Sequence, residues 1–165
     1  MIVYLVGMPG AGKSVVGREL AGRLGVPFVD LDEEIERASG SSVTEIFARD
    51  GEASFRAREA AALVHASTQD PSVVACGGGV VLEPANRIAL RNTGVAVYLD
   101  VPLEQLHDRV TPAADRPLIR KSGDLERLLV EREPLYREFA AHVVDATGSP
   151  GEVADAIVEE LRWSA

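Results

Sequence analysis

Short apolar runs alternate with longer amphipathic segments along almost the whole chain. Five runs are rich in β-branched residues and have the length of strands: residues 2–6, 26–31, 73–76, 95–99 and 142–144. The segments that are predicted as helices are 13–24, 33–39, one that opens at 42, 52–68, 84–91, 102–110, 124–140 and 151–163. This alternation predicts an α/β fold with a mainly parallel sheet.

Several residues mark where the predicted helices begin and end. Gly40 is expected to close the helix 33–39, and Ser42-Val-Thr-Glu45 has the pattern of a capping box. Asp124 is expected to cap the helix that follows it, and Pro134 predicts a break or kink inside that helix. Residues 111–123 have no apolar period and many Pro, Asp and Arg residues, so we expect a surface loop there.

The composition excludes several classes of protein. The chain has 165 residues, 46% hydrophobic and 26% charged, which is ordinary for a globular protein, and we expect one domain over residues 1–165. The formal net charge of −9 argues against a nucleic-acid or anionic-membrane surface. The longest uncharged stretches have twelve residues, short of the ~18 that a membrane span needs. A single cysteine, Cys76, cannot form an internal disulfide, which favours the reducing cytoplasm.

Residues 7–14, with the sequence GMPGAGKS, match the phosphate-binding pattern G-x-x-x-x-G-K-[ST]. The glycines let the loop turn its N–H groups toward a phosphate, and the helix predicted after the loop adds its positive N-terminal end. Lys13 can reach the β- and γ-phosphates, and Ser14 offers a hydroxyl to Mg²⁺. The motif predicts a site for a nucleoside triphosphate but does not name the second substrate.

Two aspartates follow the second predicted strand. Asp30 and Asp32 are two residues apart, so in an extended segment they share one face. Open α/β sheets bind ligands beyond the carboxyl ends of their strands, where two carboxylates can serve Mg²⁺ and an acceptor hydroxyl. The alternative is that one of them caps the helix predicted from Glu33.

Three glycines, Gly77, Gly78 and Gly79, follow the third predicted strand. They can bring backbone N–H groups close to a ligand because no side chain intervenes. The alternative is a flexible turn. Cys76 beside them is interpreted as a small buried residue rather than as a nucleophile.

Fifteen of the 17 basic residues are arginines, and a few of these stand near the motifs: Arg56, Arg58, Arg116, Arg120 and Arg132. A guanidinium can clamp a carboxylate or phosphate in a planar geometry that lysine cannot reproduce. Each arginine alone is equally compatible with a solvated surface position. The three histidines fit no triad or metal pattern and are interpreted as structural or surface residues: His65, His107 and His142.

Taken together, these residues resemble those of the shikimate kinase family. The resemblance covers nearly the whole chain, from Ile2 to about Ile157. It rests on six segments whose order and spacing are specific to this family among P-loop kinases. The segments are GMPGAGKS at 7–14, FVDLD at 28–32, IFARDGEASFRARE at 46–59, CGGGVV at 76–81, RPL at 116–118 and REPLYRE at 132–138.

The resemblance implies a three-layer P-loop kinase fold, with a five-stranded parallel sheet in the order 2-3-1-4-5 flanked by helices. It implies a shikimate-binding region at about residues 33–60 and a mobile lid at about 111–122. The implied reaction is ATP-dependent phosphorylation of the 3-hydroxyl of shikimate, in the pathway to the aromatic amino acids, with Mg²⁺ as cofactor. The expected partners are ATP and shikimate, with no nucleic acid and no membrane, and the protein is expected to be a cytoplasmic monomer.

The family's functional residues carry over to the matching positions of this sequence. The resemblance implies catalytic roles for Lys13, Asp32 and Arg116, and metal binding by Ser14 and, through a water molecule, by Asp30. The residues implied for ATP are Gly10, Ala11, Gly12, Lys13, Ser14, Val15, Arg109, Arg116 and Pro150, with Arg109 stacked on adenine opposite residues 147–150. Those implied for shikimate are Asp32, Arg56, Gly78, Gly79 and Arg132, with both arginines on its carboxylate.

Other functions remain open at this point. Gluconate also carries a carboxylate and hydroxyls, so gluconate kinase or another small-metabolite P-loop kinase is the alternative within the same class. A nucleotide-binding regulatory module without small-molecule turnover is the alternative from a different class. The complete acceptor set of Asp32, Arg56 and Arg132 argues against the regulatory module. A nucleoside monophosphate kinase would need a base pocket, which is not identifiable in the sequence.

Overall fold

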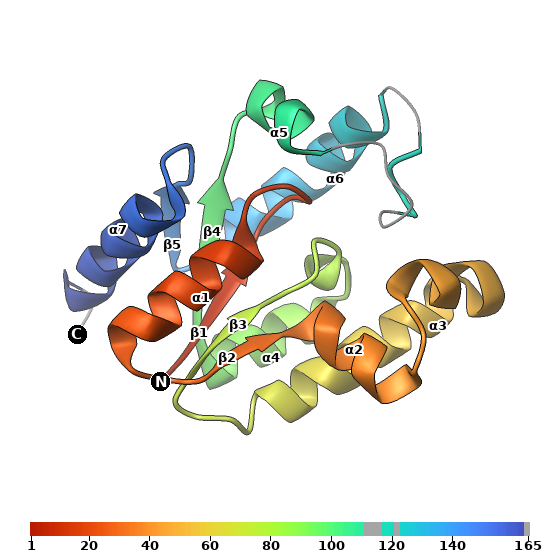
Figure 1. Ribbon diagram of the computed structural model, residues 1–165, viewed down its shortest axis with the longest axis horizontal. Helices are drawn as coiled ribbons and strands as arrows, with labels where there is room; N and C mark the ends of the chain where they lie inside the picture. The colour runs from red at the N-terminus through yellow and green to blue at the C-terminus, as the bar shows by residue number, and fades with distance from the viewer. Residues whose placement is uncertain (111–116, 121–122, 164–165) are drawn as a thin grey trace.

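Five parallel strands form one sheet in the order β2-β3-β1-β4-β5 (Figure 1). The structure is a computed structural model that describes residues 1–110, 117–120 and 123–163. The strands are β1 (Ile2–Val6), β2 (Phe28–Asp30), β3 (Ser72–Ala75), β4 (Gly94–Asp100) and β5 (His142–Asp145). The predicted α/β class and the strand order 2-3-1-4-5 are confirmed.

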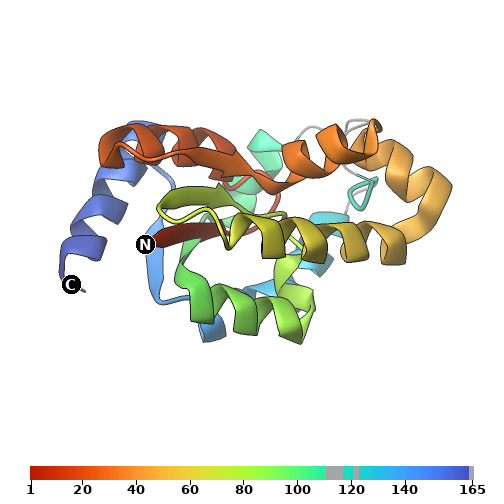
Figure 2. The same cartoon turned by 90° about the horizontal axis from the view of Figure 1, so that it is seen from below.

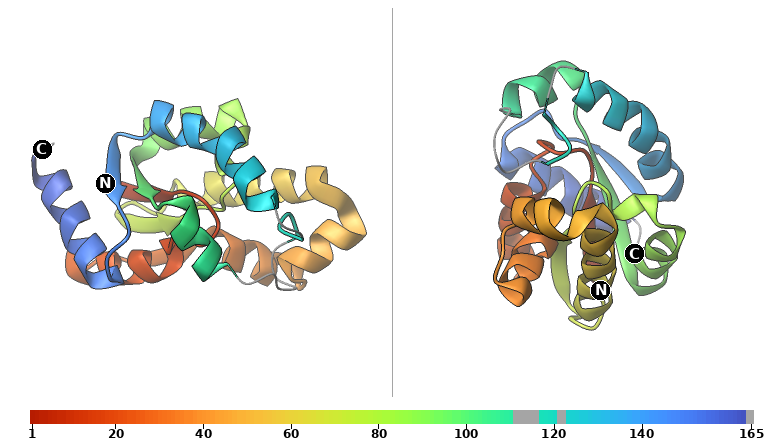
Figure 3. Two further views of the ribbon diagram at one scale, coloured as in Figure 1. Left: turned by 90° about the horizontal axis from the view of Figure 1, so that it is seen from above. Right: turned by 90° about the vertical axis from the view of Figure 1, so that its right-hand side faces the viewer.

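Helices cover both faces of this sheet, with α1 and α7 on one face and α4 and α6 on the other (Figure 2). The helices are α1 (Lys13–Leu24), α2 (Leu31–Ser39), α3 (Val43–Ala66), η1 (Val80–Leu82), α4 (Pro84–Thr93), α5 (Leu103–Arg109), α6 (Asp124–Phe139) and α7 (Pro150–Trp163). Helix α2 and the first part of α3 project to the side on which the strands end (Figure 3). None of the helices in the described ranges combines the length and apolar character of a membrane span.

The two central strands are buried on both faces, which explains their unbroken apolar sequences. All five residues of β1 and all four of β3 are buried. Side chains from α1 and from α4 and α6 cover them from opposite sides, as in other parallel sheets. The polar groups that follow these strands therefore stand at the edge of a rigid core.

Helix α1 packs close to β2 because its second turn carries a glycine. A Cβ on Gly17 would lie 2.4 Å from the ring of Phe28. Ser14 stands one turn before Gly17 on α1, and Asp30 ends the strand that Phe28 begins. The close approach of helix and strand brings Ser14 and Asp30 within hydrogen-bonding reach.

Several predicted boundaries are wrong by a few residues, and one correction concerns the site. Helix α2 begins at Leu31, two residues before the predicted start, because the carboxylate of Asp30 caps it. Helix α3 merges the two helices predicted from 42 and 52, with a non-helical backbone at Gly51 (φ 81°, ψ 171°). The predicted capping box at Ser42 is confirmed.

The expected cap of α6 is also wrong, and the break that Pro134 predicted is absent. Gly123, not Asp124, is the N-cap residue, and the Asp124 carboxylate instead accepts from the Arg120 N–H at 2.9 Å. Helix α6 continues through Pro134 to Phe139 without a break. Its buried face, which includes Leu128 and Tyr136, packs on the core on both sides of the proline, and this packing outweighs one lost backbone hydrogen bond.

The predicted lid falls largely outside the described residues. Residues 111–116, which include the candidate catalytic Arg116, and residues 121–122 belong to the part of the chain that is not described. The described residues 117–120 form a turn with no regular secondary structure, as expected for a loop.

Candidate active site

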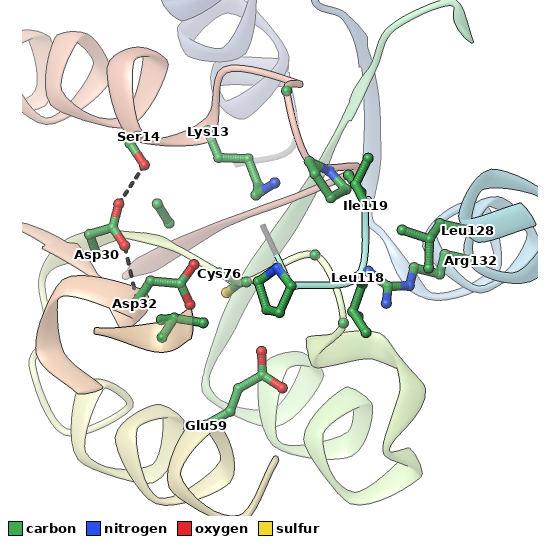
Figure 4. A pocket seen from close by; sticks show the side chains of 18 of the residues that line it. Lys13, Ser14, Asp30, Asp32, Glu59, Cys76, Leu118, Ile119, Leu128 and Arg132 are labelled. Atoms are coloured by element: carbon green, nitrogen blue, oxygen red, sulfur yellow. Dashed lines mark hydrogen bonds between the residues drawn. The ribbon is translucent and has the colours of Figure 1, made fainter. Parts of the chain in front are cut away.

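A cavity of about 520 Å³ opens at the carboxyl ends of the central strands. Its walls come from the loop after β1, the ends of β2 and β3, helix α3, residues 117–119 and helix α6 (Figure 4). Segments that are more than 100 residues apart in the sequence therefore face one space. Most of the predicted site residues lie around it.

The loop between β1 and α1 has the shape of a phosphate cradle. Gly10 and Gly12 have φ values of 86° and 90°, a conformation that favours glycine. The loop is closed by a hydrogen bond of 3.1 Å from the Ala11 N–H to the Met8 carbonyl. Lys13 lies across it, and its Nζ donates to the carbonyls of Gly7 and Met8, both at 2.9 Å. The Lys13 ammonium is thus held at the mouth of the loop, beside the positive end of α1.

Asp30 performs one of the tasks that the sequence left as alternatives, the capping of a helix, and its other oxygen bonds to Ser14. Its Oδ1 accepts from the backbone N–H of Asp32 at 3.0 Å and of Glu33 at 3.4 Å, which caps α2. Its Oδ2 accepts from the hydroxyl of Ser14 (Figure 4). Helix capping therefore leaves the second carboxylate oxygen facing the phosphate loop.

Asp32 lies in the first turn of α2 and points into the cavity (Figure 4). Burial, together with the nearby carboxylates of Asp30 and Glu59, raises its pKa to about 6, while the charge of Lys13 acts in the opposite direction. An aspartate in this state can hold a hydroxyl and accept its proton near neutral pH.

A buried carboxylate that was not predicted from the sequence stands opposite Asp32. Glu59 has no exposed surface, and its Oε2 pairs with Arg56 Nη1 at 2.8 Å. Burial raises the pKa of Glu59, and the charges of Arg56 and Arg132 partly offset this. The signal in the sequence is its position three residues after Arg56 on one helix, where the two side chains meet.

Two arginines reach the cavity from opposite sides. Arg56 comes from α3, and its side chain is 20% exposed and also contacts Glu52. Arg132 comes from α6 and is only 2% exposed. A buried guanidinium costs free energy unless anions accompany it. The nearby Glu59 carboxylate is shared with Arg56, and Arg132 Nε has no hydrogen-bond partner among the described residues, so the pair of arginines favours a further anionic ligand.

The three glycines after β3 make room for these charged groups. A Cβ on Gly77 would lie 2.6 Å from Glu59 Oε1, and a Cβ on Gly79 would lie 2.3 Å from both Nη atoms of Arg56. A Cβ on Gly78 would lie 3.2 Å from Arg132 Nη1. None of the three has a positive φ, so space rather than backbone freedom requires glycine here. A flexible turn does not account for this arrangement.

Four buried polar atoms on residues that line the cavity have no hydrogen-bond partner among the described residues. They are Asp32 Oδ1, Arg56 Nε, Glu59 Oε1 and Arg132 Nε. Buried polar groups in folded proteins are almost always paired. The cavity is therefore built for a polar ligand with both an anionic group and hydrogen-bond donors.

Comparisons with known proteins agree with this geometry. The profile of the shikimate kinase family matches residues 9–162. A shikimate kinase from Aromatoleum aromaticum is 49% identical over 98% of this chain and 95% of its own length. One from Halorhodospira halophila is 48% identical, over 97% of this chain and 93% of its own. The chain belongs to the shikimate kinase family.

A solved member of the shikimate kinase family has the same fold. The structure described as shikimate kinase from Acinetobacter baumannii in complex with shikimate matches with a TM-score of 0.96 at 38% identity. The match covers 99% of this chain and 93% of that one. The P-loop kinase fold inferred from the resemblance is thus shown over essentially the full length.

The residues expected from the shikimate kinase resemblance divide into three groups. Those that line the cavity are Gly10, Gly12, Lys13, Ser14, Val15, Asp30, Asp32, Arg56, Gly78, Gly79, Arg109 and Arg132. Ala11 is buried inside the phosphate loop, and Pro150 begins α7 outside the cavity lining. Arg116 lies outside the described residues.

Arg109, the residue expected at adenine, bridges the phosphate loop and the loop after β5. Its Nη1 donates to the Gly10 carbonyl at 3.5 Å, and its Nη2 donates to the Ala146 carbonyl at 3.3 Å. The flat guanidinium is therefore held beside the loop that precedes Pro150, although Pro150 itself does not reach the cavity.

The sequence also left the apolar side of the cavity unidentified. Phe47 and Phe55 pack against each other with ring centroids 4.7 Å apart, and the Arg56 guanidinium lies 5.3 Å from the centre of the Phe55 ring. Leu118 and Ile119 line the same cavity from the segment before α6 (Figure 4). These side chains can exclude water from a ring-shaped ligand.

Proposed function

We propose that this protein transfers the γ-phosphoryl group of ATP to the 3-hydroxyl of shikimate. The observation that carries the proposal is the buried Arg132, which faces Asp32 and Arg56 in the cavity that the phosphate loop borders. An acceptor with one carboxylate and several hydroxyls matches two guanidinium groups, one carboxylate and backbone N–H groups. Membership in the shikimate kinase family supports the same substrate.

The nucleotide is proposed to lie along the phosphate loop. Backbone N–H groups of Gly10 to Val15 surround the β- and γ-phosphates, and the Lys13 ammonium exchanges loop carbonyls for phosphate oxygens. Arg109 stacks on adenine, with residues 147–150 on the other side. Arg116 neutralises charge on the phosphates, as the family resemblance implies.

Shikimate is proposed to bind between α3 and α6. Arg56 and Arg132 pair with its carboxylate, and the backbone of Gly78 and Gly79 completes this end of the site. Asp32 accepts a hydrogen bond from the attacking hydroxyl. In transfer, the hydroxyl oxygen bonds to the γ-phosphorus, the bond to the β–γ bridging oxygen breaks, and the proton passes to Asp32.

The residues between the phosphate loop and α2 fit a Mg²⁺ ion. The Ser14 hydroxyl would be a direct ligand, and the Asp30 carboxylate, which faces it, would hold the ion through a water molecule. Mg²⁺ in kinases is held by one or two protein groups together with substrate phosphates and water. Among the described residues, no group of three or more His, Cys, Asp or Glu side chains could hold a metal ion. Phosphate oxygens of the nucleotide would supply further ligands. Bound there, Mg²⁺ would neutralise charge that develops on the phosphates.

The discriminating experiment is a coupled ADP-release assay with four arms: shikimate, gluconate, a set of nucleoside monophosphates, and no acceptor. We expect ADP release that depends on shikimate, ATP and Mg²⁺. Release with gluconate but not shikimate would establish a gluconate kinase. Nucleotide binding without release in any arm would establish a regulatory module.

The remaining expectations belong to the same proposal. Residues 1–165 act as one domain with the shikimate-binding region at about 33–60, and residues 111–122 close over the bound substrates as a lid. The protein is proposed to act as a cytoplasmic monomer, without nucleic acid or membrane partners. The acidic net charge of −9 supports the absence of nucleic acid.

Asp30→Asn is expected to raise the Mg²⁺ concentration that gives half-maximal activity by about tenfold. The amide can still accept from the N–H groups of α2, so the helix cap survives, whereas the metal loses an anionic partner. The measurement is a Mg²⁺ titration of activity at saturating ATP and shikimate. An unchanged Mg²⁺ requirement would limit Asp30 to helix capping.

Gly79→Ala is expected to raise the KM for shikimate by about tenfold or more, because the new methyl group collides with the Arg56 guanidinium. The KM for ATP should change little, since the phosphate loop is untouched. The matched control is Gly22→Ala in α1, where a Cβ meets nothing within 4 Å. That control should keep both KM values and gain slight stability from the better helix former. Equal KM values for shikimate in the two variants would contradict the role of Gly79.

A further inference from the structure

A buried tyrosine joins two parts of the acceptor site without lining the cavity. Tyr136 stands one turn after Arg132 on α6 and has no exposed surface. Its hydroxyl donates to the carbonyl oxygen of Gly78. The Arg132 guanidinium lies close to the same phenol, where its charge favours the ionised form and partly offsets the rise that burial gives to the phenol pKa. Arg132 Nη1 also lies 3.2 Å from the position of a Cβ on Gly78. The Tyr136 hydroxyl therefore adjoins both a buried guanidinium and the glycine loop.

The bond to the Gly78 carbonyl also determines where the next N–H group points. The peptide between Gly78 and Gly79 is trans, so its carbonyl and its N–H point in opposite directions. With the carbonyl held toward Tyr136, the Gly79 N–H is directed away from α6. The two guanidinium groups flank this peptide, because Arg132 approaches the Cβ position of Gly78 and Arg56 that of Gly79. An anion held by both arginines lies next to this N–H.

The phenol ring is itself fixed by packing. It stacks on Tyr98 of β4 with ring centroids 5.0 Å apart and an interplanar angle of 20°. The Arg137 guanidinium lies over the Tyr98 ring, 5.4 Å from its centre, and donates to Asp100 at 2.6 Å. Burial raises the pKa of the Tyr136 phenol, so its hydroxyl remains a proton donor throughout the working pH range.

We propose that Tyr136 is a positioning residue for the acceptor, which sets the Arg132 guanidinium and the Gly78–Gly79 peptide in one fixed geometry around the carboxylate of the substrate. The inference rests on the proposed function, because it takes shikimate as the ligand between the two arginines. Tyr136 touches neither substrate. It acts through two groups that do, so its removal weakens acceptor binding and not nucleotide binding.

Tyr136→Phe tests this role because it keeps the ring and its stacking and removes only the hydroxyl. The matched control is Tyr4→Phe, a second fully buried tyrosine whose single hydroxyl bonds to Thr93 at 2.7 Å, on β1 and away from the cavity. Both variants lose one buried hydroxyl and its hydrogen bond. A purely structural role for Tyr136 predicts that the two variants behave alike.

The readouts are the KM values for shikimate and ATP, kcat, the melting temperature, and the KM for the carboxamide analogue of shikimate. For Tyr136→Phe we expect the shikimate KM to rise by about 5- to 20-fold, with the ATP KM and kcat within about threefold of the wild type. The rise should largely disappear with the carboxamide, which cannot form the charge-assisted bonds to Arg132. Tyr4→Phe should lower the melting temperature about as much and leave every KM unchanged.

Three results would overturn the inference: an unchanged shikimate KM in Tyr136→Phe, equal increases in the KM values for shikimate and ATP, or the same penalty for shikimate and its carboxamide. These results count only if the wild-type protein phosphorylates shikimate. If the wild type does not phosphorylate shikimate at all, the proposed function fails. If the wild type phosphorylates shikimate and Tyr136→Phe leaves the KM for shikimate unchanged, only the role of Tyr136 fails.

Discussion

Asp32→Asn is expected to lower kcat by about 10²–10⁴-fold while ATP binding stays nearly unchanged. Asparagine can still accept a hydrogen bond from the acceptor hydroxyl but cannot take its proton. A loose, metaphosphate-like transition state needs little activation of the nucleophile, in which case the loss falls at or below the lower end of this range. The measurements are kcat with both substrates saturating and the dissociation constant for ATP.

The control for Asp32→Asn is Glu33→Gln, one residue further along α2. The Glu33 side chain is 62% exposed and pairs with Arg18 outside the cavity. This variant should keep wild-type kcat. If Asp32→Asn instead abolishes ATP binding and keeps shikimate binding, the roles proposed for Asp30 and Asp32 must be exchanged.

The pKa of about 6 for Asp32 has two consequences for pH. In the wild type, kcat/KM should fall below about pH 6 as the carboxylate of the free enzyme becomes protonated. The free energy of unfolding should change in the opposite direction and decrease as pH rises through this range. Because the folded protein holds this proton more tightly than the unfolded chain, ionisation of Asp32 costs stability as pH rises from about 4 to about 6. Asp32→Asn should therefore be more stable than the wild type at pH 7, by about 1–3 kcal/mol, and the gain should vanish near pH 4 in thermal unfolding.

Arg132→Lys is expected to lower kcat/KM for shikimate by about 2–4 kcal/mol of transition-state binding, or about 30- to 1,000-fold. An ammonium carries the same charge but cannot form two parallel bonds to one carboxylate. Because Arg132 is 2% exposed, water cannot replace the lost bond. The KM for ATP should change little, since α6 contacts the acceptor side of the cavity. Steady-state kinetics with each substrate varied in turn provides the measurement.

Helix α6 supplies its own control for Arg132→Lys. Arg127 has a side chain that is 64% exposed and pairs with Asp124, so Arg127→Lys changes the same residue type without entering the cavity. We expect near wild-type kinetics from this control. If both variants lose shikimate activity equally, the effect of Arg132→Lys comes from α6 as a whole rather than from the carboxylate contact.

Much of the fold was predictable because its signals are local. The central strands are buried on both faces, so residues 2–6 and 73–76 form plain apolar runs between glycines and amphipathic helices. The phosphate loop is a contiguous motif whose glycines and lysine are all needed for the cradle. The predicted boundaries that differ from the structure, such as the start of α2, depend on which side chain caps the helix. For α2 this is the Asp30 carboxylate, which accepts from the first N–H groups of the helix.

The missed parts of the site depend on contacts between distant segments. Glu59 lies in an alanine-rich helix, where a charged residue ordinarily marks the solvated face. It is buried because Arg56 pairs with it and because the glycine loop at residues 77–79 packs against it. The helical spacing of Arg132 and Tyr136 is visible in the sequence. The hydrogen bond from Tyr136 to Gly78, which is 58 residues away, is not. Glycine is needed at 77–79 because charged side chains from α3 and α6 pack against this loop and leave no room for a Cβ atom.

The two hydrogen bonds that Lys13 donates across the phosphate loop affect the entropy of nucleotide binding. Protein groups hold the curve of this loop: Lys13 bonds to the Gly7 and Met8 carbonyls, and the Ala11 N–H closes the turn on the Met8 carbonyl. Ordering a flexible loop residue costs about 1–2 kcal/mol, so bonds that keep this loop ordered reduce the entropy that nucleotide binding loses. Removing the lysine consequently does two things at once: it deletes a charge and releases the loop. A neutral residue of similar length at this position would therefore show a less favourable binding entropy in calorimetry, beyond the enthalpy lost with the ammonium–phosphate contact.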